Sequence, residues 1–259
     1  MTGKRGALAI QVSVIQALML REMTARFGGM RLGYFWAVAQ PSAQVLVFCM
    51  IFGMRGSAGM PLIDYPVFVA TGLLPWSLFK TIVTGSMNAV SANAALMNYR
   101  QVQAIDTLLA RILLEMALAF VVLTILLVSF IYAGFTVTLR DPIEVLQGVG
   151  FLIVLGAGLG MLACVLSARM PDATRFIPIA MAPLFFLSGV FFHINTVPDP
   201  YRDWLMWNPI LHGIEMIRDG FFSTHRQGNA DAGYLAMTAF PTFCAGLFVF
   251  RIYRRRLAR

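Results

Sequence analysis

Charged residues are scarce in this sequence of 259 residues. Asp, Glu, Lys and Arg together make up 12% of the chain, about half of the share that is usual in soluble proteins. Apolar residues make up 59%, and the mean hydropathy is +0.75. This composition excludes a disordered chain, a collagen-like chain and a disulfide scaffold. It predicts an integral membrane protein, because so many apolar side chains require lipid around them.

Residues suited to catalysis and metal binding are also few. The three cysteines lie singly inside apolar runs, without CxxC or Cys/His spacing. Neither GxxxxGKS nor GxxxxGKT occurs, so the chain is not expected to hold a nucleotide in the P-loop manner. His212 and Glu215 lie three residues apart without an HExxH motif, which favours a structural hydrogen bond over a metal or acid–base site. We therefore expect no enzyme activity and no metal or cofactor on this chain.

What the sequence does contain is a series of apolar segments. The runs 116–137 and 145–168 hold no charged residue and exceed the roughly 20 residues needed to cross a bilayer. In total we expect an all-α membrane protein with one domain, 1–259, and six transmembrane helices at about 36–54, 67–90, 112–137, 145–168, 176–195 and 232–250. Lys80 and Glu115 are the charged residues within these spans, and a structural ion pair between them is favoured over a carrier site.

The distribution of basic residues predicts the orientation. An even number of spans puts both termini on one side, and 14 of the 20 basic residues fall on that side against five on the other. Eight of the 12 acidic residues fall on the opposite side. Basic residues concentrate on the cytoplasmic side of membrane proteins, so both termini are predicted to be cytoplasmic. The basic C-terminal segment is explained by this rule and by anionic lipids, and no nucleic-acid partner is expected.

Two segments outside the spans carry helical patterns. In the segment 1–33, apolar residues recur at steps of three and four, namely Leu8, Val12, Ile15, Met19 and Met23. This pattern predicts an amphipathic helix at the membrane interface, and packing against other helices of the same protein is nearly as well supported.

The segment 196–231 is too apolar for a plain loop, and its apolar runs are too short to cross the membrane. Asn208 followed by Pro209 predicts the start of a helix. Isoleucines on one face and Glu215 on another then predict an amphipathic helix. We expect re-entrant helices here on the periplasmic side, because helices satisfy their own backbone groups inside lipid.

Several ordered motifs resemble those of one family of membrane proteins. The first group is Leu20-Arg21-Glu22, Arg26-Phe27-Gly28, Arg31-Leu32-Gly33-Tyr34, Trp36-Ala37 and Pro41-Ser42; the second is Asn98-Tyr99-Arg100, Ile105-Asp106-Thr107, Ala110-Arg111 and Leu114-Glu115; the third is Trp207-Asn208-Pro209 with His212 and Glu215. In their order and spacing, over nearly the whole chain, they resemble the membrane subunit of ABC-2-type exporters of capsular polysaccharide.

The resemblance implies an assembly and a substrate. The membrane subunit would form a homodimer that binds two ATPase subunits, which carry the ATP and Mg. It would export a lipid-linked, usually acidic polysaccharide across the bacterial inner membrane. A periplasmic co-polymerase adaptor and an outer-membrane channel would act downstream.

Three sets of residues are candidates for function. Polar residues on the predicted cytoplasmic side would couple the chain to the ATPase, namely Arg21, Glu22, Arg26, Asn98, Tyr99, Arg100 and Asp106. Aromatic residues could stack on sugar rings in a channel or gate, or anchor the protein at the membrane interface instead, namely Tyr34, Trp36, Phe191, Phe192, Tyr201, Trp204 and Trp207. The predicted re-entrant region contributes Asn208, Pro209, His212 and Glu215.

Other function classes stay open at this point. An ABC-2 exporter of another glycan, O-antigen or teichoic acid, would share the same features. An ATP-independent channel or secondary carrier would transport without an ATPase, and a membrane-embedded glycan enzyme would need paired carboxylates or a metal cluster at one membrane level.

Overall fold

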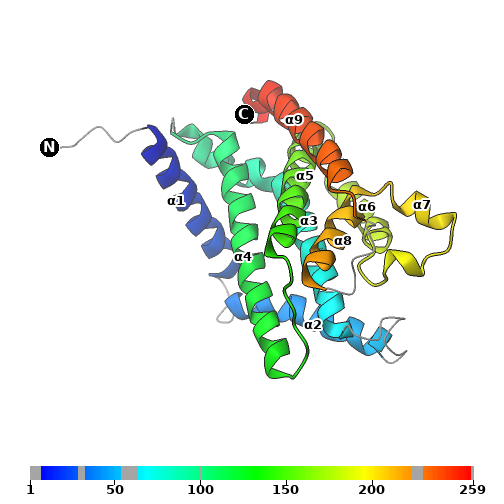
Figure 1. Cartoon of the computed structure of the whole chain (residues 1–259). Coiled ribbons are helices and arrows are strands. Elements are labelled where there is room, and N and C mark those ends of the chain that lie inside the picture. Colours follow the sequence, from blue (N-terminus) through cyan, green and yellow to red (C-terminus); the bar gives the residue numbers. More distant parts are fainter. Residues whose placement is uncertain (1–6, 29–32, 54–63, 100, 223–229, 258–259) are drawn as a thin grey trace.

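A computed structural model describes residues 7–28, 33–53, 64–99, 101–222 and 230–257, and within these ranges the chain is helical without strands. The helices are α1 (Ala7–Phe27), α2 (Gly33–Gly53), α3 (Tyr65–Ala92), α4 (Ala104–Tyr132), α5 (Pro142–Arg169), α6 (Ala173–Leu187), α7 (Tyr201–Leu205), α8 (Pro209–Phe221) and α9 (Ala232–Leu257), with short 3-10 turns at Ala94–Asn98 and Ile194–Thr196. The start of α1, the start of α4 and the end of α9 lie at one end of the bundle (Figure 1), which we call the terminal end.

Four of the helices are long and apolar enough to cross a membrane, namely α3, α4, α5 and α9. They agree with four of the six predicted spans. The other two predicted spans are covered by shorter apolar helices, Val38–Ile51 within α2 and Ala173–Leu187. In Figure 1, α2 also crosses at a steep angle to α4 and α5. Six complete spans therefore stay a prediction.

The predicted span 176–195 is wrong at its C-terminal end. Helix α6 stops at Leu187, and Gly189 adopts a φ of 69°. Glycine is the residue that most readily adopts this left-handed conformation, which ends helices. With 15 residues, α6 is about 22 Å long, shorter than the roughly 30 Å of a hydrocarbon core. Helix α6 alone is therefore too short to cross a membrane, and a complete span at this segment stays a prediction.

The span predicted at 112–137 also ends early, because α4 stops at Tyr132 and Gly134 follows with a φ of 84°. At this opposite end of the bundle, the side-chain carboxylate of Asp64 accepts hydrogen bonds of 2.7 Å from the backbone N–H and the hydroxyl of Thr136. These bonds hold the pKa of Asp64 below its usual value. They join the start of α3 to the connection between α4 and α5.

Helix α5 lies at the centre of the bundle and packs against α3, α8 and α9. Small residues allow this close packing. A Cβ on Gly158 would lie 2.7 Å from the backbone of Phe243 on α9, and one on Gly160 would lie 2.7 Å from the side chain of Ser86 on α3. Gly158 and Gly160 thus allow α5 to pack closely against two helices, α9 and α3.

Helix α1 packs against α4 rather than standing apart from the bundle. Its buried residues are Leu18, Glu22 and Phe27, whereas Leu8 and Val12 are exposed. Ile15, Met19 and Met23 of the predicted stripe are half-buried, so the second half of α1 packs against the protein's own helices, and contact of its first half with the membrane surface stays a prediction. The buried side of α1 carries a carboxylate, which periodicity of apolar residues could not reveal.

Candidate functional site

A cluster of four charged side chains joins α1 to α4. Arg26 contacts Glu115 at 2.8 Å, and Arg111 contacts Glu22 at 3.0 Å and Glu115 at 3.4 Å. Both carboxylates are buried. Two positive and two negative charges balance, so neither buried carboxylate is left without an opposite charge. We call these four residues the α1 anchor.

Further polar contacts fix the same end of the bundle. Gln11 on α1 donates to Asp106 on α4 at 3.2 Å, and Arg21 on α1 donates to Asn93 after α3. Asp106 also accepts from the backbone N–H of Gln103 at 2.9 Å, which completes a capping box at the start of α4. The packing of α1 is therefore defined by polar contacts as well as apolar ones.

These contacts divide the residues proposed for ATPase coupling. Glu22 and Asp106 are buried and hold helices together, so they are not available as a docking surface. Arg21, Arg26 and Tyr99 are exposed, although Arg26 lies at the end of α1 that points away from the terminal end, and their docking role stays a prediction. Arg100 and the side chain of Asn98 lie outside the described part of the structure. Arg111 was not among the candidates, although its spacing of four from Glu115 is a signal for a helical ion pair.

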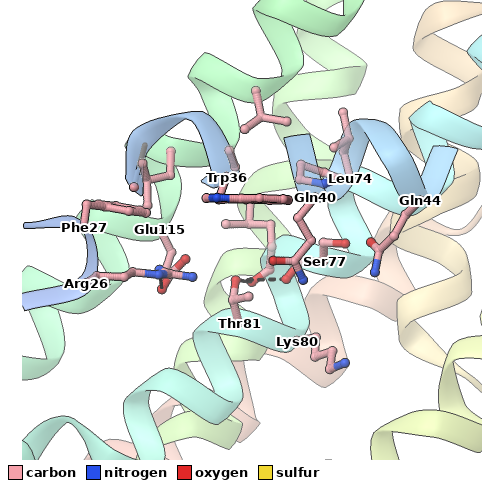
Figure 2. Close-up of a pocket in the computed structure, with 16 residues that line it drawn as sticks. Arg26, Phe27, Trp36, Gln40, Gln44, Leu74, Ser77, Lys80, Thr81 and Glu115 are labelled. Atoms are coloured by element: carbon pink, nitrogen blue, oxygen red, sulfur yellow. Dashed lines mark hydrogen bonds and ion pairs between the residues drawn. The ribbon is translucent and has the colours of Figure 1, made fainter. Parts of the chain in front are cut away.

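A groove of about 560 Å³ lies between α1, α2, α3 and α4, next to the α1 anchor. Its size is within the range of about 300–1,000 Å³ that is usual for ligand sites. Figure 2 shows Arg26 and Glu115 toward one end, Trp36 over the middle, and Gln44 and Lys80 away from the anchor. Polar groups come mainly from α2 and α3, namely Gln40, Gln44, Ser77, Lys80 and Thr81; the α4 wall contributes Leu118, Ala119 and Val122 besides Glu115.

The expected ion pair between Lys80 and Glu115 is wrong. Both residues line the groove, but Glu115 pairs with Arg26 and Arg111. Lys80 is exposed and makes no ion pair with any residue that the structure describes. The sequence analysis paired Lys80 with Glu115 because these are the charged residues inside the predicted spans. The observed partners of Glu115 lie elsewhere: Arg26 is on α1, and Arg111 is one turn earlier on α4.

Arg218 on α8 carries another buried charge, and the sequence analysis did not identify it as a site residue. Its guanidinium donates to the carbonyl groups of Gly189 and Val190 at 2.7 Å each and contacts Glu215 at 3.2 Å. It also lies 3.8 Å from the ring centroid of Phe68 on α3. These carbonyl groups belong to the chain just after α6, which ends at Leu187. Arg218 therefore ties the chain after α6 to α3 and α8.

The residues predicted for the re-entrant region all have structural contacts. Asn208 caps α8 by accepting from the N–H of Ile210, with Pro209 at the first helical position, as predicted. His212 contacts the carbonyl group of Met206 at 2.8 Å and accepts from the N–H of Asp231 at 3.0 Å. The hydrogen-bonding role expected for His212 is thus confirmed. No group of metal-ligating side chains is found among the described residues.

The predicted helix is found as α8, and its residues Ile210–Phe221 are all buried, including Glu215. Of its polar side chains, Arg218 faces α3 and the chain after α6, whereas His212 contacts Met206 and Asp231. The depth of this segment in a membrane stays a prediction.

The aromatic candidates do not form one surface. Trp36 lines the groove and is 57% exposed. Phe191 lies in a ring cluster, with centroids 4.3 Å from Phe48 and 4.9 Å from Phe185, and Phe192 is half-buried nearby. Three are exposed on and beside α7, namely Tyr201, Trp204 and Trp207, and the side chain of Tyr34 lies outside the described ones. Trp36 is therefore the aromatic candidate that the structure places in a groove with polar groups.

Comparison with known proteins gives an end-to-end match. Polysialic acid transport protein KpsM of Escherichia coli is 36% identical over 248 residues, which cover 95% of this chain and 96% of KpsM. Capsule polysaccharide export inner-membrane protein BexB of Haemophilus influenzae is 24% identical over 96% of this chain and 94% of its own length. O-antigen export system permease protein RfbA of Klebsiella pneumoniae is 24% identical over 92% and 91%. Residues 13–222 match the ABC-2 type transporter family, from α1 to the end of α8. The chain belongs to the ABC-2 type transporter family.

Proposed function

We propose that this chain is the permease subunit of an ATP-driven exporter that moves lipid-anchored capsular polysaccharide across the bacterial inner membrane. The observation that carries the proposal is the match to KpsM over 95% of this chain and 96% of that protein. BexB, also matched over nearly its whole length, is by name an inner-membrane protein of capsule export. Apolar helices α3, α4, α5 and α9 support a multi-pass protein in that membrane.

Another glycan is the second candidate substrate. RfbA is by name an O-antigen permease, and it matches over 92% of this chain. The higher identity to a polysialic acid transporter favours an acidic capsule polymer for this chain.

The energy for transport is assigned to a partner. The sequence has no P-loop motif, so ATP and Mg belong to two ATPase subunits bound at the cytoplasmic side. In this arrangement both termini are cytoplasmic, and the exposed residues Arg21, Arg26 and Tyr99 contact the ATPase. The helices of one chain are too few to enclose a polysaccharide, so a homodimer with the conduit between subunits is the economical assembly. The polymer then passes to a periplasmic adaptor and an outer-membrane channel.

Deletion of the gene in its native bacterium tests the proposal. Surface polysaccharide is measured by immunoblot of intact cells, and the lysate is analysed for retained polymer. Loss of the acidic capsule from the surface, with polymer retained inside and surface display restored by the wild-type gene, is the expected result. Loss of O-antigen with an intact capsule would support the second candidate. An unchanged surface for both glycans would overturn glycan export as the function.

The assignment of energy to a partner has its own test. The chain is purified from its native membrane in mild detergent, and ATP hydrolysis by the sample is measured. A co-purifying ATPase subunit with hydrolysis above that of a mock purification is expected. Transport activity of the pure chain alone would contradict an ATP-driven exporter and return the chain to the channel or carrier class.

A further inference from the structure

The charge of the groove is not balanced. In the α1 anchor, Arg26 and Arg111 neutralise Glu22 and Glu115. Lys80 lies outside this set, lines the same groove and is exposed. The groove therefore carries one uncompensated positive charge among its described residues.

The position of Lys80 within a helix that can cross a membrane indicates what its charge requires. It is in the second half of α3, a helix of 28 residues that is long and apolar enough to cross a membrane. A charged side chain within a membrane-spanning helix is costly unless it meets water, a polar cavity or an opposite charge. Lys80 meets this condition by facing a polar groove, and since the acidic residue of the groove is already paired with arginines, the charge of Lys80 is available to an anion brought by a ligand.

The groups around Lys80 suit a sugar. Gln40, Gln44 and Ser77 supply amide and hydroxyl groups that can bond to ring hydroxyls. Trp36 presents a half-exposed ring above Gln40 and Ser77, with Gln44 and Lys80 to one side, as Figure 2 shows. Sugar rings have an apolar face that packs against an aromatic ring, while their hydroxyls need donors and acceptors. One wall of the groove therefore offers both kinds of contact.

We propose that this groove binds an acidic sugar unit of the transported glycan, with Lys80 bound to the sugar carboxylate and Trp36 packed against the sugar ring. The inference rests on the proposed export function and adds a residue that selects for anionic substrate. It predicts that a neutral version of the same glycan binds more weakly, since a charge-assisted hydrogen bond is about twice as strong as a neutral one.

Binding is measured with the full chain in lipid nanodiscs by titration calorimetry. The probes are a glucuronate-containing tetrasaccharide and the same tetrasaccharide with its carboxylates converted to methyl esters. For the wild type, the acidic probe is expected to bind about ten-fold tighter, which corresponds to about 1.4 kcal/mol. Lys80→Gln should abolish this preference and leave the ester unaffected, Lys80→Arg should keep it, and the exposed Arg175→Gln serves as a matched control that changes neither.

Two results would overturn the proposal. The first is equal binding of the acid and the ester by the wild type, or an unchanged preference in Lys80→Gln. The second is Lys80-dependent binding of dihexanoyl phosphatidylglycerol without binding of the acidic sugar. That result would identify a lipid phosphate as the anion that Lys80 binds. Both can occur while the gene deletion still removes surface polysaccharide, so failure of this inference is distinguishable from failure of the export function.

Discussion

Arg218 gives the sharpest test of how the fold is held together. Its buried guanidinium binds the carbonyl groups of Gly189 and Val190 and the carboxylate of Glu215. Arg218→Ala would remove the buried cation that faces this carboxylate and the guanidinium donors to both carbonyl groups. Removal of one member of a buried ion pair costs about 3–5 kcal/mol. For a chain of this size, such a loss lowers the unfolding temperature by on the order of 10 °C.

The measurement is thermal unfolding of the detergent-purified full chain, followed by intrinsic fluorescence. Arg175→Ala is the matched control, because it removes the same side chain from an exposed site on α6. Arg218→Lys should fall between the two, because an ammonium group cannot reproduce the forked geometry of the guanidinium. Equal unfolding temperatures for Arg218→Ala and Arg175→Ala would refute the reasoning.

A double variant separates the two roles of Arg218. Replacement of a buried ion pair by apolar side chains is often neutral, because no charge is left behind. If the pair with Glu215 were the main contribution, Arg218→Met combined with Glu215→Leu would restore stability. We expect only partial recovery, because the carbonyl groups after α6 would still lack donors at a cost of about 1–3 kcal/mol each.

Three further predictions use other parts of the structure. In a cysteine-free background, Arg140→Cys should react with a membrane-impermeant thiol reagent on intact cells and Arg175→Cys should not; the reverse pattern would invert the topology. Gly158→Ala should destabilise the chain by about 1–3 kcal/mol in thermal unfolding, because its methyl group meets the α9 backbone, whereas Gly150→Ala has open space and should not. Trp36→Ala should lower surface polysaccharide per permease molecule while ATP hydrolysis by the complex continues, and unchanged export would remove Trp36 from the substrate path.

The sequence predicts the long helices well, because hydropathy measures the property that places them in lipid. The segments 67–90 and 145–168 lie within α3 and α5, and the cap at Asn208 is found where predicted. The end of α6 could not be predicted in the same way. Apolar residues continue beyond Gly189, and only its left-handed conformation ends the helix there.

The candidate site was predicted less completely, because a charged residue does not reveal its partner. Glu115 was matched with Lys80, yet its partners Arg26 and Arg111 come from α1 and from one turn earlier on α4. The position of Arg26 depends on how α1 packs. That packing is fixed by a buried carboxylate, Glu22, on a side of α1 that the apolar pattern did not identify.

The sequence predicted a wrong partner for Lys80 and did not identify Arg218 as a site residue, and both errors have one physical cause. Inside a membrane protein, a charge is stable beside an opposite charge, beside free backbone groups, or where water or a polar cavity reaches it, and hydropathy does not distinguish these environments. Arg218 uses carbonyl groups that exist because α6 ends early. Among the described residues, Lys80 has neither an opposite charge nor backbone carbonyl groups as partners, and it faces a groove. A buried charge satisfied by backbone therefore indicates architecture, whereas an exposed charge within an apolar span indicates a site for something the chain binds.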